Sequence, residues 1–142
     1  MKNSILITLS IFLFFTSCGD IPFDTSERGG VMMATDDKTI IIESLAKAYT
    51  EGNFDMAKDY FAEGGVHYVN NDEYTNDEVI AGYNFHSLLY DEMEHLTPWV
   101  TTMYYNDGSI YTNQWAEWTG KSKITGEAVS YTHLTLPTST HG

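Results

Sequence analysis

An apolar run near the N-terminus limits which part of the chain can build a fold. Residues Ile5 to Phe15 are apolar apart from Thr8 and Ser10, and this run of about 11 residues follows a start that carries Lys2. A helix needs about 20 residues to span the hydrocarbon core of a bilayer, so this one is too short. A basic start, a short apolar middle and a small-residue exit are typical of an export signal. We therefore expect the residues that follow to form the fold.

The end of this run resembles the lipobox of bacterial lipoproteins, with Phe15-Thr16-Ser17-Cys18 carrying Phe where Leu is more usual. The resemblance implies cleavage before Cys18 and acylation of that cysteine. Each buried methylene of an acyl chain contributes about 0.8 kcal/mol, so several chains anchor a protein to a membrane that it does not cross. We expect a signal peptide over 1–17, a lipidated tether over 18–34, and an exported product anchored on the periplasmic or surface face of a bacterial membrane.

The other end of the chain has an unusual sequence. Residues Val129 to Thr138 read VSYTHLTLPT, which resembles the translation of a transposase-type sequencing adapter. We therefore expect 129–142 to be a read-through artefact and the domain over 35–128 to be truncated. On that expectation His133 and His141 are not candidate site residues. The alternative is a natural β-rich tail.

Composition indicates one small acidic domain. The chain is 42% hydrophobic and 14% aromatic, which is enough to build a core within 142 residues. With 20 acidic and 7 basic side chains, its formal net charge is −13. Such a charge repels phosphate backbones, so we expect no nucleic-acid partner.

The spacing of apolar residues predicts three helices. The first begins at an N-cap at Thr35 or Asp36 and ends at Gly52, and a short second one extends from about Asn53 to Phe61. Thr75-Asn76-Asp77-Glu78 matches a capping box, which predicts a long third helix to about Leu96 that Pro98 ends.

Strand signals occupy the remaining segments. Val66 to Asn70 reads as a strand, and the runs Trp99–Tyr105 and Ser109–Thr119 flank the turn sequence Asn106-Asp107-Gly108. We predict a β-hairpin there and a further strand that starts near Ser122. The expected class is α+β.

This order of elements resembles the nuclear transport factor 2-like superfamily, which includes SnoaL-like cyclases and steroid isomerases. The resemblance implies a cone-shaped α+β barrel, in which a curved mixed or antiparallel sheet wraps a long helix around one apolar pocket. It also implies homodimers through the open sheet face, and it leaves the last strand of the family missing here. The residues that carry the resemblance are Ala48 to Asp55, Asp59 to Ala62, Asn113 to Gly120, and Thr125 with Gly126.

The third predicted helix carries the main candidate residue. On a helix Val79, Tyr83, His86, Tyr90 and Met93 fall on one apolar stripe, whereas Asn84, Ser87, Asp91, Glu94 and His95 fall on the opposite side. His86 should therefore point inward and His95 should face water. His86 is either a hydrogen-bonded core residue or a catalytic or ligand-binding group, and Tyr83 and Tyr90 would line its pocket.

Two further regions offer candidates. In the family's isomerases the first strand bears a catalytic Asp, and here His67 can take that place, although alternation does not tell which face of the strand lines the pocket. On the hairpin, Asn113 and Trp115 share one face, while Gln114 and Trp118 share the other. Either face can line a pocket for a flat organic ligand, and we assign the pocket to Asn113 and Trp115.

Other site chemistries lack their motifs. The sequence has no phosphate-binding glycine loop, no cysteine pair and no His-Glu-x-x-His zinc helix, and its single cysteine is the expected lipidation site. We therefore expect no metal and no cofactor. Three functions remain, in this order: a lipid-anchored domain that binds a small apolar or aromatic molecule, a cyclase- or isomerase-like enzyme using an inward histidine, and an assembly module that uses the sheet face.

Overall fold

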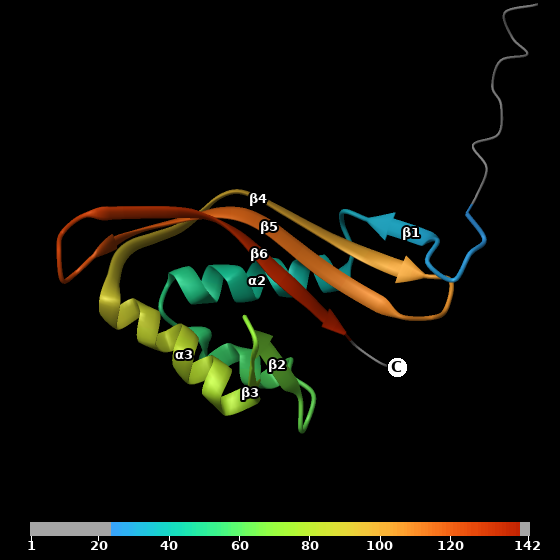
Figure 1. The fold of residues 1–142 in the computed structure, drawn as a ribbon, viewed down its shortest axis with the longest axis horizontal. Helices are drawn as coiled ribbons and strands as arrows, with labels where there is room; N and C mark the ends of the chain where they lie inside the picture. The colour runs from blue at the N-terminus through green and yellow to red at the C-terminus, as the bar shows by residue number, and fades with distance from the viewer. Residues whose placement is uncertain (1–23, 140–142) are drawn as a thin grey trace, which may run out of the picture.

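The computed structural model describes residues 24–139, with side chains through Thr132. These residues form mixed α+β structure, with a curved antiparallel sheet on one side and two helices on the other (Figure 1). The expected signal peptide (1–17) and Cys18 lie outside the described residues. The sheet has the order β1-β4-β5-β6, with bounds Gly30–Met33, Tyr90–Tyr105, Ile110–Ser122 and Ala128–Ser139.

The order of the remaining elements confirms the sequence prediction except at β3, a strand that was not predicted. Helix α2 (Asp37–Thr50) is followed by a 3₁₀ helix, η1 (Phe54–Asp59), a small hairpin of β2 (Val66–Val69) and β3 (Asp72–Thr75), and helix α3 (Asn76–Leu89). Figure 1 shows α2 lying along the sheet, with α3 and the β2–β3 hairpin on its other side. The helix that packs along the sheet is therefore α2. The family resemblance had implied that the helix beginning at Thr75, which is α3, takes that position.

The N-terminus of α2 is fixed to the sheet through one carboxylate. Asp36 caps the helix by accepting from the backbone N–H of Thr39 at 2.8 Å. The same carboxylate accepts from the hydroxyls of Thr102 at 3.0 Å and Tyr104 at 2.7 Å, both on β4. A single side chain thus satisfies a helix end and sets the position of α2 against the sheet.

The predicted end of the third helix at Leu96 is wrong. Helix α3 begins at the predicted capping box of Thr75 and Glu78, but it ends at Leu89, and the chain continues directly as the 16-residue strand β4. One extra residue on β4 between Asp91 and Glu94 forms a β-bulge, and Glu92 there has a φ of 53°. The bulge shifts the inward-outward alternation, so that Tyr90 and Met93 both contact the core at a spacing that imitates a helix.

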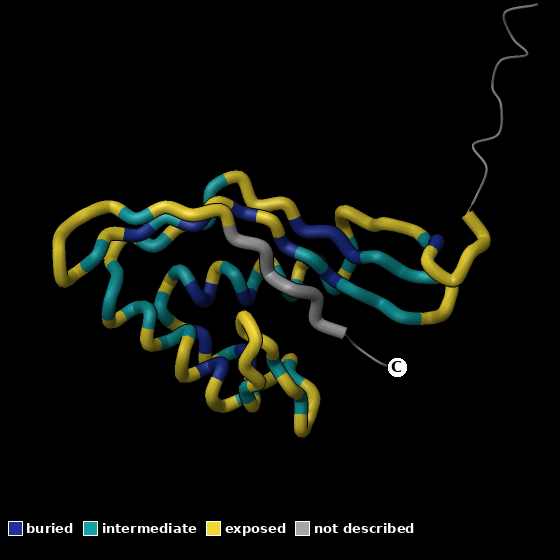
Figure 2. The backbone as a smooth tube through the Cα atoms, in the orientation of Figure 1, coloured by how far each residue is buried: buried dark blue, intermediate teal, exposed yellow. Residues whose placement is uncertain are grey.

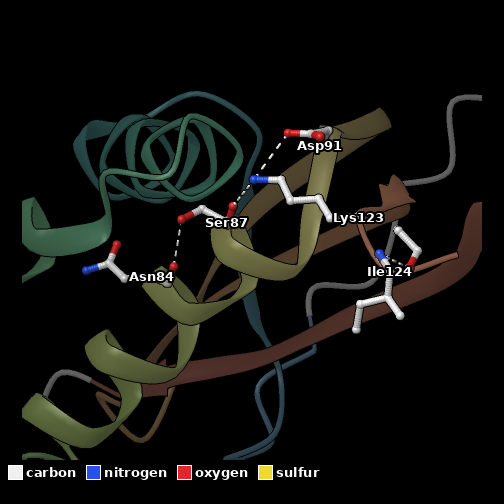
Figure 3. Close-up of polar contacts among 6 residues, drawn as sticks. Asn84, Ser87, Asp91, Lys123 and Ile124 are labelled. Atoms are coloured by element: carbon white, nitrogen blue, oxygen red, sulfur yellow. Dashed lines mark hydrogen bonds and ion pairs between the residues drawn. The ribbon is translucent and has the colours of Figure 1, made fainter. Parts of the chain in front are cut away.

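The turn between β5 and β6 holds the end of α3 in place (Figure 3). The Lys123 ammonium donates to the carbonyl of Ser87 at 2.7 Å and lies 3.2 Å from the Asp91 carboxylate, while the backbone N–H of Lys123 donates to the carbonyl of Leu89 at 2.8 Å. Carbonyls in the last turn of a helix lack partners within the helix, and a cation there is favourable. These contacts satisfy that helix end where the sequence pattern alone predicts more helix.

The β4–β5 hairpin is confirmed, and its two faces differ. Thr112, Gln114, Ala116 and Trp118 on β5 are buried, whereas Trp115 and Glu117 between them are exposed. Figure 2 shows the buried segments of the middle strands and of both helices, with the turns at either end exposed. The core therefore lies between the helices and the inner face of β4 and β5, with Leu45, Phe54, Ile80 and Trp118 among its members.

The two edge strands differ from the predicted bounds of the tether and of the last strand. Residues 30–33 of the expected tether form β1, which pairs with β4, so the segment 18–34 is not a linker throughout. A four-residue strand is too short to show alternation. At the other edge, the strand predicted from near Ser122 begins at Ala128 and pairs with β5 over most of the segment that resembles an adapter. Over residues 24–139 the sheet does not close into a barrel, and no helix there is long and apolar enough to cross a membrane.

Candidate functional site

A group of aromatic rings meets between α2, α3 and the inner face of β4 and β5. Neighbouring ring centroids within the group lie 4.8 to 6.5 Å apart, mostly edge to face. We call it the Tyr49 cluster, and it consists of Tyr49, Phe54, Tyr83, His86, Tyr90, His95 and Trp118. It is the place where both helices and the middle strands contribute side chains to one apolar volume.

A hydrogen bond between the two helices lies inside this cluster. The Tyr49 hydroxyl on α2 is 2.9 Å from Nδ1 of His86 on α3. Burial lowers the pKa of His86 and raises the pKa of Tyr49 well above its usual range, because a low-dielectric surrounding disfavours the charged form of each group. Both side chains are therefore uncharged at neutral pH. His86 is half-buried.

A second histidine approaches the cluster from the sheet. The ring of His95 on β4 lies 5.6 Å from that of Tyr49, and its Nδ1 is 3.4 Å from the side-chain nitrogen of the buried Gln114. The prediction that His95 faces water is wrong. It assumed that the helix continued to Leu96, whereas on β4 the residue pairs with Trp118 and shares its inward direction.

Trp118 is the most deeply buried ring of the Tyr49 cluster. Its side chain is 1% exposed, and its indole Nε1 has no acceptor with hydrogen-bond geometry. Burial raises the pKa of Tyr49, and Trp118 opposes that effect. The ring of Tyr131 on β6 stacks on Trp118 at 4.9 Å. A buried donor without an acceptor is uncommon, and here it lies among the rings of the Tyr49 cluster.

The structure brings together only some of the residues predicted from the sequence. Tyr83, His86 and Tyr90 lie together in the Tyr49 cluster. Asn113 and Trp115 belong to the outer face of the sheet, where Trp115 is 52% exposed and pairs across the strands with Trp99. The assignment of Asn113 and Trp115 to the same pocket wall is therefore corrected. The inner hairpin face, with Gln114 and Trp118, takes that place.

His67 lies in a separate polar contact on the β2–β3 hairpin. Its Nε2 is 2.8 Å from the side-chain oxygen of Asn76, whose amide nitrogen donates to the carbonyl of Ala62 at 2.8 Å. Because the amide oxygen can only accept, Nε2 of His67 carries a proton. The ring also packs against Phe61 at 4.4 Å. These contacts hold the small hairpin on the N-terminus of α3 and bring no second candidate group to His67.

Among the described residues, no three His, Cys, Asp or Glu side chains gather closely enough to hold a metal ion. An open hollow of about 320 Å³ lies at the first bulge of β4 and is lined by Glu92, Thr119, Gly120, Lys121, Gly126 and Ala128. None of the predicted site residues lines this hollow. The chemistry that the described residues support best is therefore that of the Tyr49 cluster: apolar ring faces around a few uncharged hydrogen-bonding groups.

Tyr49 and His95 are not predicted as site residues, and the hairpin face with Gln114 and Trp118 is the alternative that the pocket assignment did not choose. Tyr49 lies within the first predicted helix, but nothing in the sequence pairs it with His86. Comparisons with known proteins provide no further guide, since no protein-family model, no curated protein and no solved structure matches the chain.

Proposed function

We propose that this chain is a membrane-anchored domain that binds a small, flat organic molecule at the Tyr49 cluster. The observation that carries the proposal is the 2.9 Å contact between Tyr49 and His86 within a shell of aromatic rings, on a histidine that is not fully buried. Small-molecule sites typically combine apolar and aromatic walls with a few fixed polar groups that orient the ligand. The Tyr49 cluster has this composition.

The resemblance to the nuclear transport factor 2-like superfamily supports the same location. In that family the pocket lies between a helix layer and the concave face of a curved sheet, and the curved sheet with α2 and α3 beneath it suits such an arrangement. We propose the SnoaL-like form of this fold for the domain. Acylation of Cys18 would place the site near a bacterial membrane surface, within reach of apolar molecules that partition there.

A thermal-shift screen of neutral cyclic compounds tests the proposal on the full chain. Compounds that bind only the folded protein raise Tm, and the shift grows with the ligand concentration relative to Kd. We expect the shift to be lost in Tyr90→Ala and His86→Gln, and to persist in Trp115→Ala and Asn113→Ala, which change the outer face of the same sheet. Shifts that follow the outer-face variants instead, or a screen without any shift, would contradict the proposal.

One observation favours catalysis as a second candidate function. The lowered pKa of His86 keeps the imidazole neutral near pH 7, the state in which a histidine exchanges protons with a substrate, as a cyclase- or isomerase-like enzyme requires. One experiment separates catalysis from binding alone. Each compound that shifts Tm is incubated with the full chain and followed by mass spectrometry and NMR. Turnover that His86→Gln abolishes supports an enzyme, whereas unchanged compound supports binding alone.

The outer face of the sheet favours a third candidate function, the assembly of this chain with another protein chain. Trp99 and Trp115 pair across β4 and β5 with 64% and 52% of their surfaces exposed, and Met32 on β1 is 60% exposed. Large apolar side chains gathered on one face usually mark a contact surface. A second copy of this chain is the proposed occupant, since a twofold contact joins one patch to itself. Sedimentation velocity should show a dimer that Trp99→Ser with Trp115→Ser converts to monomer, and a wild-type monomer at all concentrations would exclude it.

A further inference from the structure

The direction of the Tyr49 to His86 hydrogen bond can be deduced from the donors around it. Tyr49 is 7% exposed, so its hydroxyl hydrogen needs a protein acceptor, and Nδ1 of His86 is the acceptor within reach. The two nitrogens of His86 differ in this respect, since Nδ1 makes the contact with Tyr49 and Nε2 does not. The tautomer of His86 therefore decides which of the two groups donates.

Only one direction of this hydrogen bond pairs the hydroxyl hydrogen of Tyr49 with Nδ1 of His86. If Tyr49 donates to Nδ1, its hydrogen is paired inside the cluster. If Nδ1 donated to Tyr49 instead, the hydroxyl hydrogen would lose that acceptor while the side chain lies buried. An unpaired buried donor costs about 1 to 3 kcal/mol, which is enough to select the first arrangement by at least about fivefold.

We propose that His86 is held as the tautomer that carries its proton on Nε2, and that the ligand of the Tyr49 cluster bears an uncharged hydrogen-bond acceptor such as a ring ketone. Nε2 of His86 has no partner among the described residues, so its N–H is free to meet a ligand. The second half of this inference rests on the proposed small-molecule function. The first half stands without it.

Charge excludes the other obvious acceptor, an anion. The Tyr49 cluster contains neither Lys nor Arg, and the chain as a whole carries a formal net charge of −13. An anionic ligand would approach against that field and meet neutral donors only. A neutral carbonyl or ether oxygen loses less hydration on entry and still accepts from His86. The same tautomer argues against His86 as a base through Nε2, because that nitrogen already holds a proton.

NMR of the full chain with isotope-labelled histidine tests the tautomer directly. Ring-nitrogen and ring-carbon shifts distinguish a proton on Nε2 from one on Nδ1, and His86→Gln assigns the signal among the five histidines. We expect His86 to carry its proton on Nε2 near pH 7. Tyr49→Phe should release that preference, while Tyr105→Phe, which changes a tyrosine outside the Tyr49 cluster, should preserve it. A proton on Nδ1 in the wild type would overturn the inference.

Matched probes test the ligand class by calorimetry. Indanone and indane share one ring skeleton, but only indanone has an acceptor. We expect indanone to bind about tenfold more tightly, as one hydrogen bond allows, and expect His86→Phe to remove the difference. Equal binding of both probes to the wild type would overturn the acceptor preference while leaving the proposed binding function intact. Binding of neither probe would overturn the ligand half together with that function, whereas the NMR result would still decide the tautomer.

Discussion

The Tyr49 hydroxyl and Nδ1 of His86 lie 2.9 Å apart although 37 residues separate them in the chain. This contact joins α2 to α3 within an aromatic cluster. A polar contact in such a place affects both the stability of the packing and the protonation of the histidine. Each effect can be measured separately.

Removing the Tyr49 hydroxyl should destabilise the fold modestly. Tyr49→Phe keeps the ring packing but leaves Nδ1 of His86 without its donor, so we expect a loss of about 1 kcal/mol in the free energy of unfolding. Urea denaturation of the full chain measures it. Tyr105→Phe is the matched control, since its hydroxyl makes no hydrogen bond in the described region and its ring contact with Tyr111 is retained. Equal losses in both variants would contradict a role for the Tyr49 contact.

The pH dependence of stability should carry the signature of His86. Burial lowers its pKa in the folded chain below the ordinary value of 6.5, so between these two values the unfolded chain binds more protons. Stability therefore falls as the pH drops through about 6.5 towards the folded pKa, and the loss is complete below it. His86→Gln should remove this part of the slope. His67→Gln, which removes a histidine outside the Tyr49 cluster, should leave it in place.

Much of the fold follows from local sequence signals. The capping residues Asp36 and Thr75 mark helix starts that the structure confirms, and the turn at Asn106 to Gly108 sets the long hairpin. These elements depend on hydrogen bonds within a few residues, which a local pattern reveals. The end of α3 depends instead on Lys123, more than 30 residues away, and on a bulge that disguises strand alternation as helical spacing.

The candidate site could be predicted only in part, for the same reason. Helical spacing placed Tyr83 and His86 correctly, because both lie within α3. Alternation divided the hairpin into two faces but did not identify the inner one, since each face carries a tryptophan, Trp115 on one and Trp118 on the other. The packing of α2 and α3 against the inner face decides between them, and that information is tertiary.

The carboxylate of Asp36 should stabilise the fold through its charge. Burial raises its pKa, but hydrogen bonds from the helix backbone, Tyr104 and Thr102 outweigh that effect and hold the pKa below its ordinary value of 3.8. A lowered pKa contributes stability that is present above 3.8 and is lost as the pH falls through the folded value.

Asp36→Asn tests this contribution, because Asn caps a helix about as well as Asp but accepts with a single oxygen. We expect a loss on the order of 1 kcal/mol near pH 7 that shrinks towards acid pH. Asp37→Asn removes the same charge from an exposed neighbouring position and should cost less. A larger effect at Asp37 would show that general charge, rather than the link from α2 to β4, is responsible.

Two glycine substitutions should change stability in opposite directions. A Cβ on Gly120 would lie 2.5 Å from the ring of Trp118, which is buried and cannot move away freely, so Gly120→Ala should cost about 1 to 3 kcal/mol. A Cβ on Gly82 in α3 meets nothing within 4 Å, and alanine favours the helix, so Gly82→Ala should stabilise by about 0.5 to 1 kcal/mol. Urea denaturation compares the free energies of unfolding of the two variants.

Gly120→Ala should also affect the proposed site. Because Trp118 belongs to the Tyr49 cluster, this variant should weaken ligand binding, whereas Gly82→Ala should not. If Gly120→Ala were neutral in both measurements, the close packing of Trp118 on β5 would be wrong, and with it the geometry on which the proposed site depends.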